Sequence, residues 1–66
     1  MQITINAESQ TVPEGSSVAD LIDLLQLQNK RLAIEINKEL VPRSTFASHK
    51  LSENDEIEIV HAIGGG

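Results

Sequence analysis

The fold is decided by the stretch Ser17-Val18-Ala19-Asp20-Leu21-Ile22-Asp23-Leu24-Leu25, which has the strongest helical signal in the sequence. Its apolar residues follow the i, i+3, i+4, i+7 spacing of one helix face, and they are Val18, Leu21, Ile22 and Leu25. Ser17 is a typical N-cap, because its side chain can accept a hydrogen bond from an early backbone N–H. The periodicity stops near residues 27–29, where we expect the helix to fray. The segment therefore predicts one amphipathic helix with a single apolar face to bury.

Short alternating segments on both sides of the helix predict the strands that cover this face. They are residues 2–6 and 8–12 before the helix, and residues 32–36, 39–41 and 56–62 after it. Asn6-Ala7 and Asn37-Lys38 are the expected turns of two hairpins, since asparagine tolerates the left-handed backbone that a tight turn requires.

This order of elements predicts an α+β domain of the β-grasp (ubiquitin-like) type. A mixed sheet of four or five strands would carry the main helix on one face, with the last strand parallel to the first. We expect residues 1–62 to form this domain. Residues 63–66 are expected to form a flexible C-terminal glycine tail that leaves from one end of a central strand.

Length and composition exclude several classes of function. The chain has 66 residues, no cysteine and Phe46 as its one aromatic residue, so the core is thin and an enclosed substrate pocket is not expected. A net charge of −5 disfavours nucleic-acid binding, which needs a basic face. No apolar run is long enough for a membrane span and no signal peptide opens the chain. We therefore expect a cytoplasmic protein that binds neither nucleic acid nor membrane.

The side chains form no recognisable catalytic or metal-binding motif. The two histidines, His49 and His61, are far apart in sequence and have no cysteines to complete a metal site. No glycine-rich phosphate loop joins a strand to a helix, so the chain is not expected to bind ATP by itself. We expect a carrier that partner enzymes act on, with no bound cofactor or metal, and not an enzyme.

The remaining chemical feature is the C-terminal run Gly64-Gly65-Gly66. Glycines lack Cβ atoms and can thread a narrow channel, and residues 63–66 would reach about 13 Å when extended. The α-carboxylate of Gly66 could then enter a partner's active site without a side chain in the way. Adenylation would give it AMP as a leaving group, and a sulfur nucleophile could displace AMP to leave a thiocarboxylate. Because the chain has no cysteine to hold a persulfide, any sulfur it carries is expected at this terminus.

Three segments together resemble the ThiS family of thiamine-biosynthesis sulfur carriers. They are MQITIN at residues 1–6, INKELVPR at residues 36–43 and DEIEIVHAIGGG at residues 55–66. A terminal Gly-Gly alone is shared by many ubiquitin-like carriers, whereas all three segments in so short a chain are specific. Gly65 and Gly66 match the family's essential pair.

The resemblance implies a sequence of partners for this terminus. A ThiF-like adenylating enzyme would use MgATP to activate Gly66, and a persulfide sulfur donor would then supply the sulfur. A ThiG-like thiazole synthase would accept the thiocarboxylate and build the thiazole moiety of thiamine. Ala7 departs from the family, which often has glycine in the first hairpin, and this leaves the turn type open. Gly64 is an extra glycine that lengthens the tail without disturbing the match.

Partner docking is expected on the sheet face and edge near residues 57–63, where the tail leaves the domain. The candidate residues are Ile59, His61 and Ile63, and Arg43 could add a charged contact. Four acids precede the C-terminus, namely Glu53, Asp55, Glu56 and Glu58. We expect them to line a solvated strand edge or, alternatively, to form a negative flank that steers the tail towards a basic partner.

Three other functions remain open for the same chain. A molybdopterin synthase small subunit would use the same terminal thiocarboxylate on the same fold, although such chains are usually longer and richer in aromatic residues. A ubiquitin-like protein modifier would join Gly66 to target lysines through isopeptide bonds. A plain β-grasp interaction domain would carry inert glycines.

Overall fold

The computed structural model describes residues 1–61, and the structural statements below concern that part of the chain. Its elements, in chain order, are β1 (Gln2–Ile5), β2 (Glu8–Thr11), α1 (Val18–Leu24), β3 (Leu32–Ile36), β4 (Glu39–Val41), the 3₁₀ turn η1 (Arg43–Thr45) and β5 (Glu56–His61). Each predicted strand is present, within a residue or two of its expected ends.

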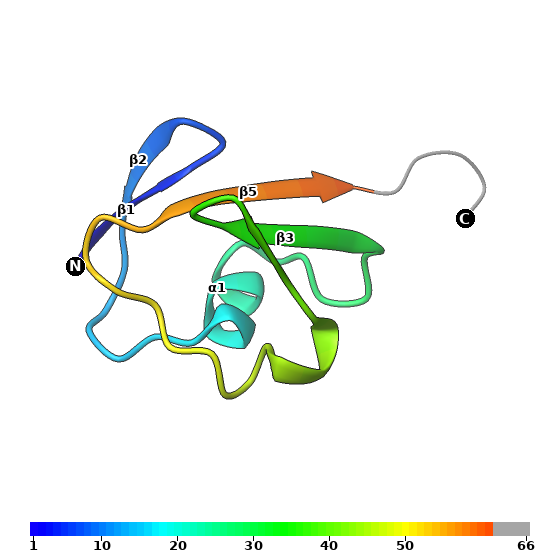
Figure 1. The fold of residues 1–66 in the computed structure, drawn as a ribbon. Helices are drawn as coiled ribbons and strands as arrows, with labels where there is room; N and C mark the ends of the chain where they lie inside the picture. Colours follow the sequence, from blue (N-terminus) through cyan, green and yellow to red (C-terminus); the bar gives the residue numbers. More distant parts are fainter. Residues whose placement is uncertain (62–66) are drawn as a thin grey trace.

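The five strands form one mixed sheet in the order β2-β1-β5-β3-β4. β5 lies in the middle, parallel to β1 and antiparallel to β3. Figure 1 shows α1 crossing one face of this sheet, beneath β5 and β3. The predicted α+β architecture is confirmed, including the parallel pairing of the first and last strands and the central place of the last strand.

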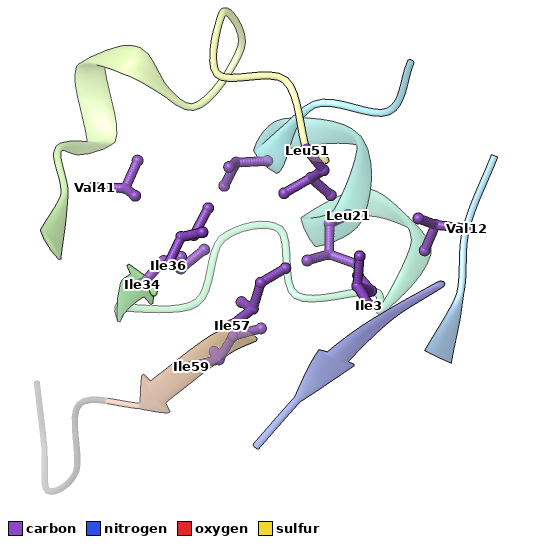
Figure 2. Close-up of a cluster of buried hydrophobic side chains, with 10 residues drawn as sticks. Ile3, Val12, Leu21, Ile34, Ile36, Val41, Leu51, Ile57 and Ile59 are labelled. Carbon is purple, nitrogen blue, oxygen red and sulfur yellow. The ribbon is translucent and has the colours of Figure 1, made fainter. Parts of the chain in front are cut away.

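The core lies between α1 and the covered face of the sheet. It consists of ten buried apolar side chains: Ile3, Val12, Val18, Leu21, Ile34, Ile36, Val41, Leu51, Ile57 and Ile59. In Figure 2, Ile57 and Ile59 point from β5 to the same side as Ile3 and face Leu21 of the helix. Ile22 and Leu25 complete the predicted helix stripe at the margin of this cluster, and Phe46 packs there as well.

The helix begins where the sequence predicts and ends earlier. Ser17 is the N-cap: its side chain accepts from the Asp20 N–H at 3.1 Å, while the Asp20 carboxylate accepts from the Ser17 N–H at 2.9 Å. This reciprocal pair is a capping box. The expected fraying near residues 27–29 is wrong by about one turn, because the helix stops at Leu24 and Gln26 adopts a left-handed φ of 59°. A left-handed residue cannot continue a right-handed helix.

Both hairpins turn through two residues with positive φ. The values are 50° and 70° for Asn6 and Ala7, and 51° and 72° for Asn37 and Lys38. Two successive positive values are typical of the type I′ turn, whose twist matches that of the flanking strands. The turn type of the first hairpin, which Ala7 left open, is therefore type I′. The alanine occupies a conformation that favours glycine.

Replacing Ala7 with glycine should therefore stabilise the domain. Relief of the left-handed strain outweighs the greater freedom of glycine in the unfolded chain, and we expect Ala7→Gly to raise the free energy of unfolding by about 0.5–1 kcal/mol. Urea denaturation measures the change. Ala33→Gly, in the extended strand β3, is the matched control and should lower stability. A loss of stability in both variants would contradict the strain argument.

The capping box should make part of the stability depend on acid pH. The hydrogen bond from the Ser17 backbone N–H, with a second from its side chain, lowers the pKa of Asp20 below its usual value of 3.8. A lowered pKa in the folded state stabilises the protein above the unfolded value, and this contribution disappears as the pH falls through the folded value. We expect Asp20→Asn to reduce the slope of unfolding free energy against pH below about pH 4.

Ser17→Ala separates the two halves of the box in the same measurement. This variant removes the side-chain acceptor and should cost about 1 kcal/mol. It keeps the backbone donor to Asp20, so it should retain more of the acid dependence than Asp20→Asn does. Equal slopes for Asp20→Asn and the unmodified protein would show that this carboxylate does not contribute.

Candidate functional site

The candidate site lies at the end of β5, the strand that leads to the C-terminus. Its last residue, His61, is paired with Leu32 of β3. The predicted sulfur-carrying Gly66, the threading residues Gly64 and Gly65, and Ile63 all lie outside the described residues, so those predictions stand as they were made. What the structure does describe is the strand and the surface from which these residues continue.

Backbone hydrogen bonds and two asparagine side chains hold β5 in place. The backbone N–H groups of Asn6 and Asn37 both donate over 2.8 Å, to the carbonyls of Ile57 and Glu56 respectively. The Asn37 Oδ1 accepts from the Glu56 N–H at 3.0 Å. The Asn6 Oδ1 accepts from the Ile59 N–H at 2.9 Å, and its Nδ2 donates to the Ile59 carbonyl at 3.3 Å. The turns of both hairpins are therefore hydrogen-bonded to β5, the strand that continues to the C-terminus.

One member of the predicted acidic flank is a structural residue. The side chain of Asp55 is only 8% exposed. Its carboxylate accepts from the Ser52 N–H at 2.8 Å and from the Asn37 Nδ2 at 3.1 Å. The other three acids, Glu53, Glu56 and Glu58, are exposed. Asp55 therefore shapes the loop before β5, and only its three neighbours can act on a partner by charge.

The predicted docking residues divide between core and surface. The docking role predicted for Ile59 is wrong. This residue is 7% exposed and packs in the core, because it shares the covered face of β5 with Ile57. Its side chain cannot contact a partner while the domain is folded. His61 and Arg43 are exposed, as a docking role requires. Arg43 borders a shallow groove of about 210 Å³ that also includes Leu32, the pairing partner of His61.

The face of the sheet opposite α1 carries a patch that sequence reasoning missed. Leu40 is 67% exposed and Val60 is 61% exposed. Ala33 is directly opposite Val60 in the β3–β5 register, and Glu35 is directly opposite both Leu40 and Glu58. We call these residues, with Glu56, the outer face: Ala33, Glu35, Leu40, Glu56, Glu58 and Val60. Strict alternation along Glu56–His61 would have indicated Val60, which lies on the same side as Glu56 and Glu58.

The outer face contains a pair of facing carboxylates that lowers the stability of the fold. Glu35 and Glu58 place like charges opposite each other on adjacent strands, a pairing that is unfavourable in water. A surface that combines exposed apolar groups with uncompensated charge is typical of a binding surface.

Other chemistry is sparse in the described part of the chain. Among residues 1–61, no group of three or more His, Asp or Glu side chains could hold a metal ion. Within the same range, no helix is long and apolar enough to cross a membrane. His49 is half-buried, and its backbone carbonyl accepts from the Val18 N–H at 2.9 Å, so it supports the start of α1.

Comparison with known proteins gives consistent matches over the whole chain. The sequence profile of the ThiS family matches residues 3–66. The sulfur carrier protein ThiS of Escherichia coli is 32% identical over 66 residues, which cover all of both chains. The crystal structure of the thiamine biosynthesis protein ThiS from Geobacter metallireducens superimposes with a TM-score of 0.85 at 29% identity, again over all of both chains.

A larger protein contains a region similar to this chain. A thiazole synthase of Magnetococcus marinus is 38% identical over 66 residues, which are all of this chain and 20% of that protein. The chain therefore spans about a fifth of the length of this relative.

Proposed function

Because this chain belongs to the ThiS family, we propose that it is a sulfur carrier protein of thiamine biosynthesis and that it carries sulfur on the α-carboxylate of Gly66. The observation that carries the proposal is the place of β5. This strand is central, is paired on both edges, and is followed after Ala62 and Ile63 by the glycine run that the family match includes. A firmly held strand with a short glycine-ended continuation suits a terminus that other proteins must handle.

The proposed chemistry takes place in two stages on partner enzymes. In the first, a carboxylate oxygen of Gly66 attacks the α-phosphate of MgATP on a ThiF-like adenylating enzyme, and pyrophosphate leaves. In the second, the outer sulfur of a partner's cysteine persulfide attacks the carbonyl carbon and AMP leaves. A thiol then cleaves the S–S bond, which releases the thiocarboxylate and leaves a disulfide on the partner.

This chain acts in these steps as a co-substrate and not as an enzyme. It has no cysteine, so the persulfide and the cleaving thiol belong to its partners. Its own contribution is to present one unhindered carboxylate at the end of a rigid strand. We propose that the carrier works in the cytoplasm, where the proposed charging step has ATP available.

Thiazole synthase is the proposed acceptor of the sulfur. The support is the Magnetococcus thiazole synthase, in which a region similar to the whole of this chain occurs within a longer polypeptide. Two activities joined in one polypeptide meet at a high effective concentration, which favours components that act in succession. We infer that the thiocarboxylate of this carrier supplies the sulfur of the thiazole ring.

The outer face is the proposed docking surface for the adenylating enzyme. It lies on the strand that leads to Gly66, so an enzyme bound there is well placed to receive the terminus. Val60 and Leu40 supply apolar contact area, while Glu35 and Glu58 favour a basic partner surface. This surface takes over the role that the sequence assigned to Ile59, and His61 remains an exposed candidate at the end of β5.

The charging of Gly66 can be tested by mass. After incubation with the adenylating enzyme, MgATP and a sulfur donor, the intact protein should gain the mass of one oxygen-to-sulfur exchange, and fragmentation should place it on Gly66. A variant with one residue added after Gly66 should stay unmodified with an unchanged fold. If the extended variant is still sulfurated, the proposed site is wrong.

The same preparation separates the alternatives. Transfer of the sulfur to thiazole synthase supports the thiamine pathway, and transfer to a molybdopterin synthase large subunit would replace it. Covalent adducts on lysines of other proteins would indicate a protein modifier. If deletion of Gly65 and Gly66 left the biological function intact, the terminal glycines would be inert.

The docking surface can be tested with two matched truncations. Val60→Ser removes exposed apolar area from the outer face and should raise the KM of adenylation for the carrier by about tenfold, as loss of a central interface contact does. Leu24→Ser removes a similarly exposed side chain from α1, on the other side of the sheet, and should leave KM unchanged. Equal effects in the two variants would contradict docking on the outer face.

A further inference from the structure

The end of β5 is held on its β1 side by one side chain. β1 pairs with β5 at two positions, Thr4 with Glu56 and Ile5 with Ile57, and then turns away through residues 6–7 to form β2. Beyond that point, the side chain of Asn6 takes the place of a strand. Its amide forms both hydrogen bonds that a neighbouring backbone would offer, accepting from the Ile59 N–H and donating to the Ile59 carbonyl.

Asn37 is the counterpart of Asn6 in the second hairpin. Both are the first residue of a two-residue turn, with φ of 51° and 50° respectively. Asn37 is hydrogen-bonded to the start of β5. Its Oδ1 accepts from the Glu56 N–H, and its Nδ2 donates to the Asp55 carboxylate. Asn6 is hydrogen-bonded to Ile59, which lies two residues before His61 at the end of β5 that continues to Gly66. Both asparagines hold β5 through their side-chain amides, and they differ in which end of the strand they hold.

We propose that Asn6 is a positioning residue for the sulfur-carrying terminus, because its side-chain amide fixes the end of β5 to the turn that follows β1. This inference rests on the proposed function. The adenylating enzyme receives a terminus that continues from this strand end, so motion of the strand end is passed on to it. If Ile59 were released on its β1 side, β5 would keep its pairing with β3 but could splay from the rest of the sheet at its end. Small displacements of a reacting group cost much of the rate.

The effect belongs to the step after docking. Glu58 and Val60 flank Ile59, and without the amide they keep their pairing with Glu35 and Ala33 of β3, so the outer face is retained for binding of the enzyme. Loss of the amide should lower kcat for adenylation and leave KM near its normal value. A variant that had only lost stability would keep a normal kcat at a temperature where it remains folded.

Asn6→Gly and Asn37→Gly form the matched test. Glycine accepts the positive φ of both turns, so each hairpin is kept while one amide is removed. With the adenylating enzyme and MgATP, we expect Asn6→Gly to lower kcat about five- to tenfold, as the loss of two hydrogen bonds in the aligned state would, and Asn37→Gly to leave kcat unchanged. Hydrogen exchange should quicken at the Ile59 amide in Asn6→Gly and at the Glu56 amide in Asn37→Gly.

A partial substitution supplies a second reading if Asn6→Gly does not fold. Asn6→Asp tolerates the same backbone and keeps the acceptor for the Ile59 N–H but loses the donor to the Ile59 carbonyl. It should therefore lower kcat by less than Asn6→Gly does, with KM again near normal.

The outcomes distinguish this inference from the function on which it rests. If the unmodified protein is sulfurated on Gly66 and both Asn6 variants keep a normal kcat, the positioning role is wrong and the carrier function stands. Equal losses of kcat in Asn6→Gly and Asn37→Gly would likewise overturn the positioning role. If the unmodified protein is not sulfurated, the proposed function and this inference fall together.

Discussion

The central position of β5 is the constraint on which the rest of the structure depends. Its side chains Ile57 and Ile59 are buried against α1, and each fully buried isoleucine contributes about 1.5–3 kcal/mol. Its β3 edge is paired along the strand, and its β1 edge is paired at two positions and then bonded by the Asn6 side chain. The C-terminal residues therefore continue from a strand that is paired on both of its edges.

Side-chain hydrogen bonds to the backbone do much of the organising in this small domain. Neither a disulfide nor a large aromatic core is available, since the chain has no cysteine and one aromatic residue. The loops are instead closed by short polar contacts, such as Asp55 with the Ser52 N–H and Ser17 with Asp20. Among residues 1–61, no buried side-chain polar atom lacks a hydrogen-bond partner. Satisfied polar groups of this kind specify one arrangement of loops around a thin core.

The two faces of the sheet have different physical roles. The face under α1 is apolar and supplies the stability, whereas the outer face combines exposed Leu40 and Val60 with the opposed carboxylates of Glu35 and Glu58. The opposed carboxylates disfavour folding, and the proposed docking of a partner on this face would account for their presence.

The sequence by itself determined the elements of this fold and pointed to the C-terminus as the proposed site. Alternation and the i, i+3, i+4, i+7 pattern are local properties, and they located the strands, the start of α1 and both asparagine turns. Alternation also puts Ile59 on the face of Ile57, so its burial was readable, and the docking role given to it conflicted with that pattern. The end of α1 was misplaced because Leu27 continues the apolar composition, while the left-handed Gln26 leaves no mark in it.

Only the tertiary structure decided which groups hold the strand that carries the terminus. Asn6 and Ile59 are 53 residues apart, and their contact depends on the parallel register of β1 and β5 and on where the first turn leaves the sheet. The burial of Asp55 beside Asn37 and the assembly of the outer face from β3, β4 and β5 depend on register in the same way. Local patterns specify which face of a strand a residue occupies, but the neighbour opposite it is set by how distant strands align.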